Sequence, residues 1–110
     1  MHNSISSGVW PTMITPFDKN NNIDYNNLDN LLEWYLDKGI DGLFAVCQSS
    51  EMFYLSLAER EELAKYVRKK IPSSIPVIAS GHISKKFKDQ VIELKVMSNT
   101  GIDALVLVTN

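Results

Sequence analysis

The segment GIDGLFAVCQSSEMFYLS, residues 39–56, decides the fold of this 110-residue chain. Gly39 suits the left-handed position that ends many helices. The apolar run 42–46 lacks the alternation of a half-exposed strand, so it predicts a strand that is buried on both faces. The small polar side chains of residues 47–50 then predict a loop, and Ser56 opens the next helix. In α/β proteins, a loop at the carboxyl end of a strand is where ligands bind.

The same alternation of strand and helix extends in both directions. Apolar runs predict strands at residues 9–15, 42–46, 76–80 and 102–108, and helical patterns cover residues 24–38, 56–70 and 85–99. The order β-α-β-α-β-α-β implies a parallel sheet with right-handed crossovers in an α/β fold. Two architectures stay open for this single domain, residues 1–110. One is a small doubly wound sheet, and the other is the first half of a (β/α)8 barrel, which needs about 250 residues to close.

Local signals define the helices more closely. Asp24 can cap the first helix, and Ser56 with Glu59 has the spacing of a capping box. The positions of the third helix expected to face the core are Phe87, Val91, Leu94 and Met97 or Ser98.

A short internal similarity links two of the predicted strands. Residues 39–46, GIDGLFAV, resemble residues 101–108, GIDALVLV. Each copy has a glycine that ends a helix, then an aspartate, then a buried strand. Eight residues are too few to prove a duplication, because the same physical demands at a helix-to-strand transition could produce both.

Composition excludes several classes of protein. The net charge is −2 and the lysines are spread along the chain, so no basic stripe suggests nucleic-acid binding. No apolar run approaches the about 20 residues that span a bilayer, so we expect no membrane segment and a cytoplasmic protein. The single cysteine, Cys47, excludes an internal disulfide, and no His or Cys pair has metal-ligand spacing, so neither a metal site nor a cofactor is expected.

Three groups of residues together resemble a known family. They are Thr15-Pro16-Phe17 with Ile23-Asp24, then Gly39-Ile40-Asp41-Gly42-Leu43, then Glu51 with Leu55-Ser56 and Glu59-Arg60. These motifs resemble those of the dihydrodipicolinate synthase / N-acetylneuraminate lyase family of pyruvate-dependent aldolases, in register over nearly the whole chain. The resemblance implies the first half of a TIM barrel in an enzyme that is usually a homotetramer. It also implies a Schiff base between pyruvate, or a similar 2-oxo acid, and a lysine on a later strand.

The resemblance also places a substrate site on the loop after the second predicted strand. In the family, a G-T-T-G-E loop holds the pyruvate carboxylate. Its two hydroxyl positions fall on Gln48 and Ser49, its second glycine on Ser50 and its acid on Glu51. The resemblance therefore implies Gln48, Ser49 and Ser50 as substrate-binding residues. An amide at Gln48 can donate to a carboxylate but cannot relay a proton as a hydroxyl does, so a 2-oxo acid other than that of lysine biosynthesis fits better.

The imine-forming lysine and the proton-relay tyrosine have no counterpart in the sequence. Every lysine falls in a predicted turn or helix, and no tyrosine follows a later strand. The chain is therefore expected to be the N-terminal fragment of such a lyase, with no catalytic residue of its own and inactive alone. A second hypothesis is a catalytically silent half-barrel that binds a partner or self-associates through its open edges.

Three further interpretations concern single features. His82 follows the third predicted strand, so it could line the site or be an ordinary loop histidine. Cys47 ends a predicted buried strand, where a thiol is usually inert packing. A response-regulator fold of similar length is excluded, because it needs an aspartate at the end of the third strand, where this chain has Ser80.

Overall fold

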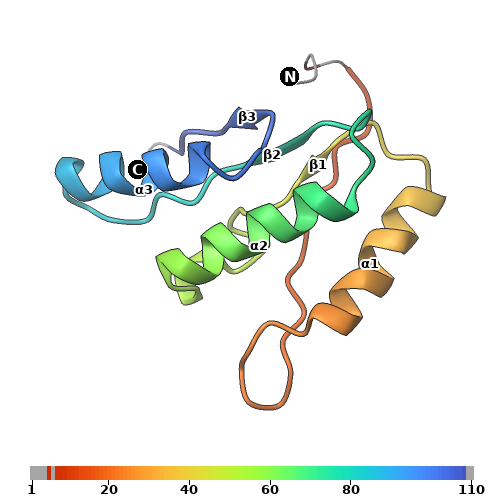
Figure 1. Cartoon of the computed structure of the whole chain (residues 1–110), viewed down its shortest axis with the longest axis horizontal. Helices are drawn as coiled ribbons and strands as arrows, with labels where there is room; N and C mark the ends of the chain where they lie inside the picture. The colour runs from red at the N-terminus through yellow and green to blue at the C-terminus, as the bar shows by residue number, and fades with distance from the viewer. Residues whose placement is uncertain (1–4, 6, 109–110) are drawn as a thin grey trace.

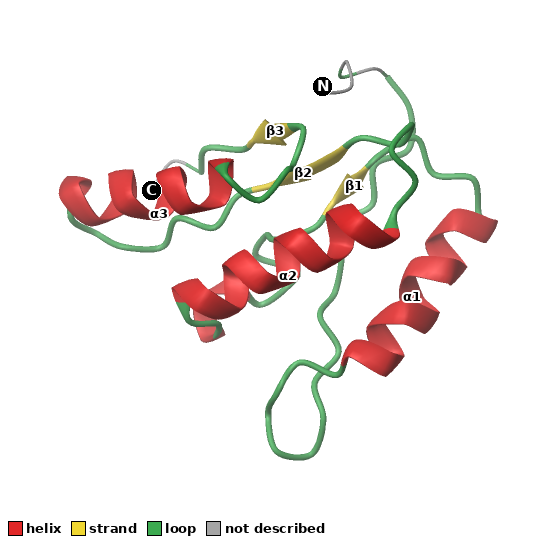
Figure 2. Cartoon of the chain, viewed as in Figure 1, coloured by secondary structure: helices red, strands yellow, loops and turns green. Residues whose placement is uncertain are grey.

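The computed structural model describes residue 5 and residues 7–108. Its elements in chain order are α1 (Tyr25–Asp37), β1 (Leu43–Phe44), the 3-10 turn η1 (Met52–Tyr54), α2 (Leu57–Lys70), β2 (Val77–Ala79), α3 (Phe87–Ser98) and β3 (Ala104–Leu105). Figures 1 and 2 show the three helices alternating with the strands. The predicted α/β order is confirmed.

The sheet is parallel in the order β1-β2-β3. The first predicted strand, residues 9–15, is extended chain rather than a regular strand. It is nevertheless the fourth parallel segment, because a bridge pairs Thr12 with Phe44 and the Met13 amide donates to the Phe44 carbonyl at 2.8 Å. Pairing also continues past the regular strands, as in the 2.7 Å bond from the Ser80 amide to the Val46 carbonyl.

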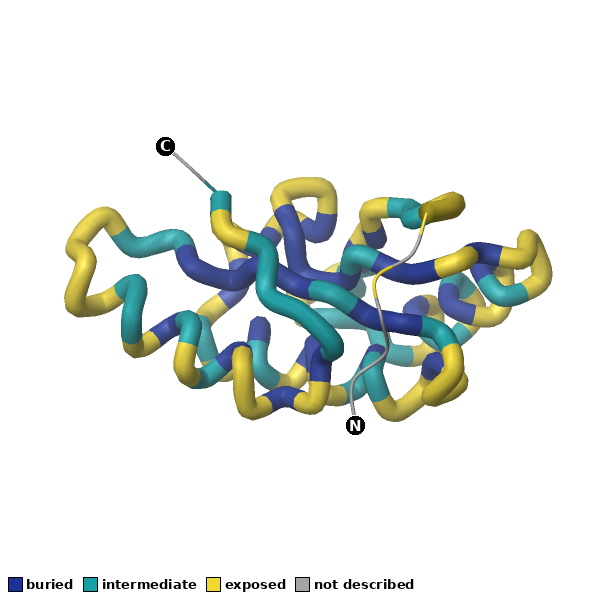
Figure 3. Tube along the Cα trace, turned by 90° about the horizontal axis from the view of Figure 1, so that it is seen from above, coloured by how far each residue is buried: buried dark blue, intermediate teal, exposed yellow. Residues whose placement is uncertain are grey.

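All three helices lie on one side of this layer (Figure 3). Side chains that face the helices, such as Leu43, Val77 and Ala79, are fully buried. Their neighbours Phe44 and Ile78 point to the other face and are only partly buried. The prediction that residues 42–46 are buried on both faces is therefore wrong at Phe44, because no helix covers that face within the described residues.

The helix caps follow the sequence. Asp24 accepts a hydrogen bond from the Asn27 amide at 3.0 Å, and Ser56 and Glu59 form the expected reciprocal capping box. Gly39 and Gly101 have φ of 73° and 89°, which is the left-handed conformation that glycine adopts without strain. These two glycines end α1 and α3 as predicted.

The inward face of α3 differs from the prediction. Phe87 is 79% exposed, whereas Glu93, one turn before the fully buried Met97, is 4% exposed. The apolar pattern could not predict which face of α3 points inward, because the residue at the inward position, Glu93, is charged. Glu93 is drawn in by a partner on α2, described below.

The two copies of the GID motif have the same structural role. The Asp41 carboxylate accepts from the Val9 amide at 2.7 Å, and the Asp103 carboxylate accepts from the Val77 amide at 2.8 Å. In return, each aspartate donates its own amide to the carbonyl of the same valine, at 2.9 and 2.8 Å. Each aspartate therefore clamps the amino end of its strand to the amino end of the preceding one.

Candidate functional site

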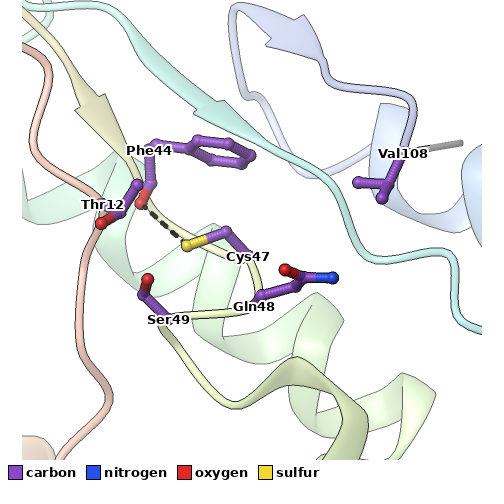
Figure 4. A pocket seen from close by; sticks show the side chains of 6 residues that line it. All are labelled: Thr12, Phe44, Cys47, Gln48, Ser49 and Val108. Atoms are coloured by element: carbon purple, nitrogen blue, oxygen red, sulfur yellow. Dashed lines mark hydrogen bonds between the residues drawn. The ribbon is translucent and has the colours of Figure 1, made fainter.

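A pocket of about 190 Å³ lies at the carboxyl ends of the parallel segments. It is lined by Thr12, Phe44, Cys47, Gln48, Ser49 and Val108. These residues belong to the first extended segment, to β1 and the loop after it, and to the chain after β3. Figure 4 shows the Gln48 amide extended toward the side that carries Val108, with Ser49 on the side of Thr12. The pocket thus unites two of the three predicted substrate-binding residues.

Two consecutive turns give the loop its shape. The Ser50 amide donates to the Cys47 carbonyl at 3.1 Å, and the Glu51 amide donates to the Gln48 carbonyl at 2.9 Å. Gln48 and Ser49 therefore occupy the apex, and both are exposed. Within residue 5 and residues 7–108, no acceptor is bonded to either of their backbone amides. The apex therefore has amide, hydroxyl and backbone N–H donors free for a ligand.

Ser50 is turned away from the pocket. Its side chain is fully buried, and its hydroxyl lies within hydrogen-bonding reach of the Met13 and Ala45 carbonyls. It also lies 3.2 Å from the Cys47 sulfur. The structure therefore does not bring Ser50 to the pocket with Gln48 and Ser49, and ligand contact by Ser50 stays a prediction. Its hydroxyl instead ties the loop to the extended segment that holds Met13.

Cys47 and Glu51 flank the apex in different environments. Cys47 is 4% exposed, and its sulfur lies 3.8 Å from the Phe44 carbonyl, drawn as a dashed line in Figure 4. Glu51 has a φ of 60°, unusual for a residue with a side chain. It lines a separate pocket of about 390 Å³ together with Phe17, Asn21 and Tyr54. Glu51 therefore does not line the smaller pocket, whereas Cys47 lines it with a side chain that is almost fully buried.

A buried ion pair supports the neighbouring loop after β2. Arg60 of α2 and Glu93 of α3 meet at 2.8 Å with side chains that are each 5% exposed. Glu93 also accepts from the amides of Ile83 and Ser84 at 3.2 and 3.0 Å, and Arg60 donates to the Gly81 carbonyl. Burial by itself would raise the pKa of Glu93, but the Arg60 and Ser84 hydrogen bonds outweigh it and lower that pKa.

Sequence reasoning missed this pair. One signal was available, since Glu93 interrupts the apolar run Val91-Ile92-Glu93-Leu94 at an inward phase of the helix. A charged residue at such a position needs a partner of opposite charge, and Arg60 stands one turn into the preceding helix.

His82 is bound to the strand end that borders the pocket. It is 8% exposed, and its Nε2 accepts a hydrogen bond from the Val108 amide at 2.9 Å. His82 itself does not line the pocket, but the residue that it holds does. His82 is therefore a loop histidine with a hydrogen bond, and the partner that it holds borders the pocket.

Other chemistry is not assembled in the described part of the chain. Among residue 5 and residues 7–108, no group of three His, Cys, Asp or Glu side chains could hold a metal ion. No helix in the same residues is long and apolar enough to cross a bilayer. Every lysine is exposed and lies in a helix, turn or loop. No amine therefore points into the pocket from these residues.

Comparisons with known proteins agree on one family. A sequence model of the Dihydrodipicolinate synthetase family matches residues 5–110. The 4-hydroxy-tetrahydrodipicolinate synthase of Oceanobacillus iheyensis is 38% identical over 100 residues, and the N-acetylneuraminate lyase of Citrobacter koseri is 32% identical over 103 residues. These alignments cover 91% and 93% of this chain but 34% of each relative. The chain thus spans about a third of the length of these curated relatives.

Solved structures show the same relation. The dihydrodipicolinate synthase of Bacillus anthracis has a TM-score of 0.85 at 29% identity, covering 96% of this chain and 36% of its own. The synthase of Acinetobacter baumannii, solved in complex with pyruvate, also has a TM-score of 0.85, at 27% identity, covering 93% and 35%. The match of the family model over nearly the whole chain, with these relatives, shows that the chain belongs to the dihydrodipicolinate synthetase family.

Proposed function

We propose that the chain is the N-terminal part of a class I aldolase or lyase, and that its loop after β1 binds the carboxylate of pyruvate or a similar 2-oxo acid. The observation that carries this proposal is the placement of Gln48 and Ser49 on one pocket at the carboxyl ends of the strands. Both side chains are exposed, and the backbone amides beside them have no partner within the described residues. Neutral donors of this kind suit a carboxylate.

The proposed chemistry divides between this loop and a residue outside it. The amide of Gln48, the hydroxyl of Ser49 and the backbone N–H groups fix the carboxylate and so orient the adjacent ketone. A lysine amine then attacks the ketone carbon, water leaves, and the imine loses a proton to give the enamine that makes or breaks a C–C bond. No cofactor takes part, and the whole enzyme is proposed to be a homo-oligomer, as a tetramer.

Gln48 limits what the loop can do. Its amide donates to a carboxylate, but it cannot pass a proton through its own ionisation. The loop is therefore proposed to bind and orient the substrate without relaying protons. A related aldolase or dehydratase reaction, rather than the lysine-biosynthetic one, is the activity that this difference favours.

Pyruvate binding to the 110-residue chain tests the proposal. Titration followed by amide NMR should shift the signals of Gln48 and Ser49. Methyl pyruvate, which has no charge, should not shift them. Ser49→Ala should weaken binding about ten- to a hundredfold, the loss expected for one hydrogen bond to a charged group.

Ser98→Ala is the matched control, because Ser98 is exposed on α3 and its hydroxyl bonds only the Lys95 carbonyl among the described residues. It should bind pyruvate as the parent chain does. Equal shifts with pyruvate and with its methyl ester, or equal affinity in Ser49→Ala, would remove the carboxylate site.

A further inference from the structure

We infer that His82 is a positioning residue, whose neutral imidazole holds Val108 in place as a wall of the pocket that contains Gln48 and Ser49. The link to substrate rests on the proposed carboxylate-binding function. The hydrogen bond itself rests on geometry alone, because the Val108 amide lies 2.9 Å from His82 Nε2.

The His82 imidazole accepts a hydrogen bond just beyond the point where the backbone hydrogen bonds between the β2 and β3 segments end. Within the described residues, the last backbone bond between the β2 and β3 segments runs from the Val106 amide to the Ala79 carbonyl at 2.9 Å. Two residues later, the corresponding acceptor for the Val108 amide would be the Gly81 carbonyl, which accepts from Arg60 instead. His82 Nε2 supplies that acceptor from a side chain, so the strand end stays beside the pocket.

The loop that carries His82 is itself fixed. Arg60 holds the Gly81 carbonyl, and Glu93 holds the amides of Ile83 and Ser84. Gly81 has a φ of 110°, and a Cβ there would lie 2.7 Å from a side-chain carbon of Met97. The loop therefore has little room to move, and the His82 imidazole attached to it is held in place.

The hydrogen bond requires one protonation state. A ring nitrogen that accepts has no hydrogen, so the neutral ring carries its proton on Nδ1. When the imidazole is protonated, both nitrogens become donors and Nε2–H faces the N–H of Val108. The bond is then lost and replaced by two opposed donors, so the pocket wall moves.

The charged side chains near the His82 loop have partners of their own. Arg60 from α2 and Glu93 from α3 neutralise each other in their 2.8 Å pair. The loop after β1 contributes Cys47, Gln48 and Ser49 to the pocket that Val108 also lines (Figure 4). On the β3 side, Asp103 is engaged with the Val77 amide at the amino end of the sheet, away from His82. Among the described residues, these charged groups are therefore engaged with partners other than His82.

The experiment follows the Val108 amide and the His82 ring by NMR from pH 8 to 5. The Val108 signal should move along the same titration curve as the ring. His82→Gln places a carbonyl oxygen that accepts but does not titrate, so Val108 should then be insensitive to pH. A Val108 signal that stays constant while the His82 ring titrates would overturn the inference.

Pyruvate affinity gives the second readout. The parent chain should lose about three- to tenfold in affinity between pH 8 and 5, the effect of one hydrogen bond. His82→Gln should lose none, and His82→Leu should bind weakly at both values. Identical profiles in all three chains would refute the positioning role. If no chain binds pyruvate while Val108 still follows the ring, the role in holding the strand stands and the carboxylate function fails.

Discussion

At the scale of single residues, three successive positions of the loop after β1 have two different roles. Two are proposed to bind substrate, and the third supports the loop. Gln48 and Ser49 expose their polar groups to the pocket, whereas the next residue, Ser50, buries its hydroxyl between the Met13 and Ala45 carbonyls. The G-T-T-G-E motif that this loop resembles has a glycine where this chain has Ser50. The serine adds a link between the loop and the first extended segment that glycine cannot make.

Ser50→Ala should therefore destabilise the chain by about 1–3 kcal/mol, because it leaves buried carbonyl oxygens without a donor. Urea denaturation measures this change in the free energy of unfolding. Ser49→Ala is the matched control, since its side chain is exposed and its loss should change stability by less than about 0.5 kcal/mol. Equal stability of the two variants would show that the buried hydroxyl contributes nothing.

At the scale of elements, α2 and α3 are joined by the buried pair of Arg60 and Glu93, which also shapes the loop after β2. Burying two charges costs solvation free energy, and the pair survives because both partners satisfy backbone groups as well. Removing one partner leaves the other charge unpaired in the protein interior. The helices themselves follow from local sequence, whereas this contact between them joins residues far apart in the chain.

The pH dependence of stability should reveal Glu93. Its pKa in the folded chain is lowered below the usual 4.5, so its stabilisation is present above about pH 4.5 and is lost as the pH falls through the folded value. Glu93→Gln should unfold about 3–5 kcal/mol more easily at pH 7, as is typical when a buried pair loses a partner. The difference from the parent chain should shrink as the pH approaches 3.

Glu61→Gln is the control for that experiment. Glu61 forms a surface pair with Lys65 at 3.3 Å on α2, with side chains that are 36% and 55% exposed. Surface pairs contribute about 0–1 kcal/mol, so its stability should follow the parent chain at every pH. A Glu93→Gln chain as stable as Glu61→Gln at pH 7 would contradict the importance of the buried pair.

At the scale of the whole molecule, the sequence predicted the alternating order, the helix caps and the position of the loop after β1, because each depends on neighbouring residues. It failed where distant contacts decide. The first strand is reduced to one bridge at Thr12, and the inward phase of α3 depends on Arg60, far along the chain. The link from His82 to Val108 spans two elements and leaves no periodic signal. The uncovered sheet face agrees with a chain that spans about a third of its relatives' length.

The proposed absence of an imine-forming lysine is likewise tested on the whole chain. Incubation with pyruvate and borohydride, followed by mass spectrometry, should give no covalent adduct, because every lysine is exposed and away from the pocket. A full-length synthase of the family treated in the same way should be trapped. A pyruvyl adduct on any lysine of this chain would refute its proposed inactivity.

The paired aspartates at the amino ends of the strands have a consequence for how this loop can evolve. Asp41 and Asp103 fix the register of the strands at their amino ends, opposite the pocket at their carboxyl ends. Substitutions in the loop of Gln48 and Ser49 can therefore accumulate without letting one strand slip against the next. Such a division lets the specificity of the loop change at little cost in folding.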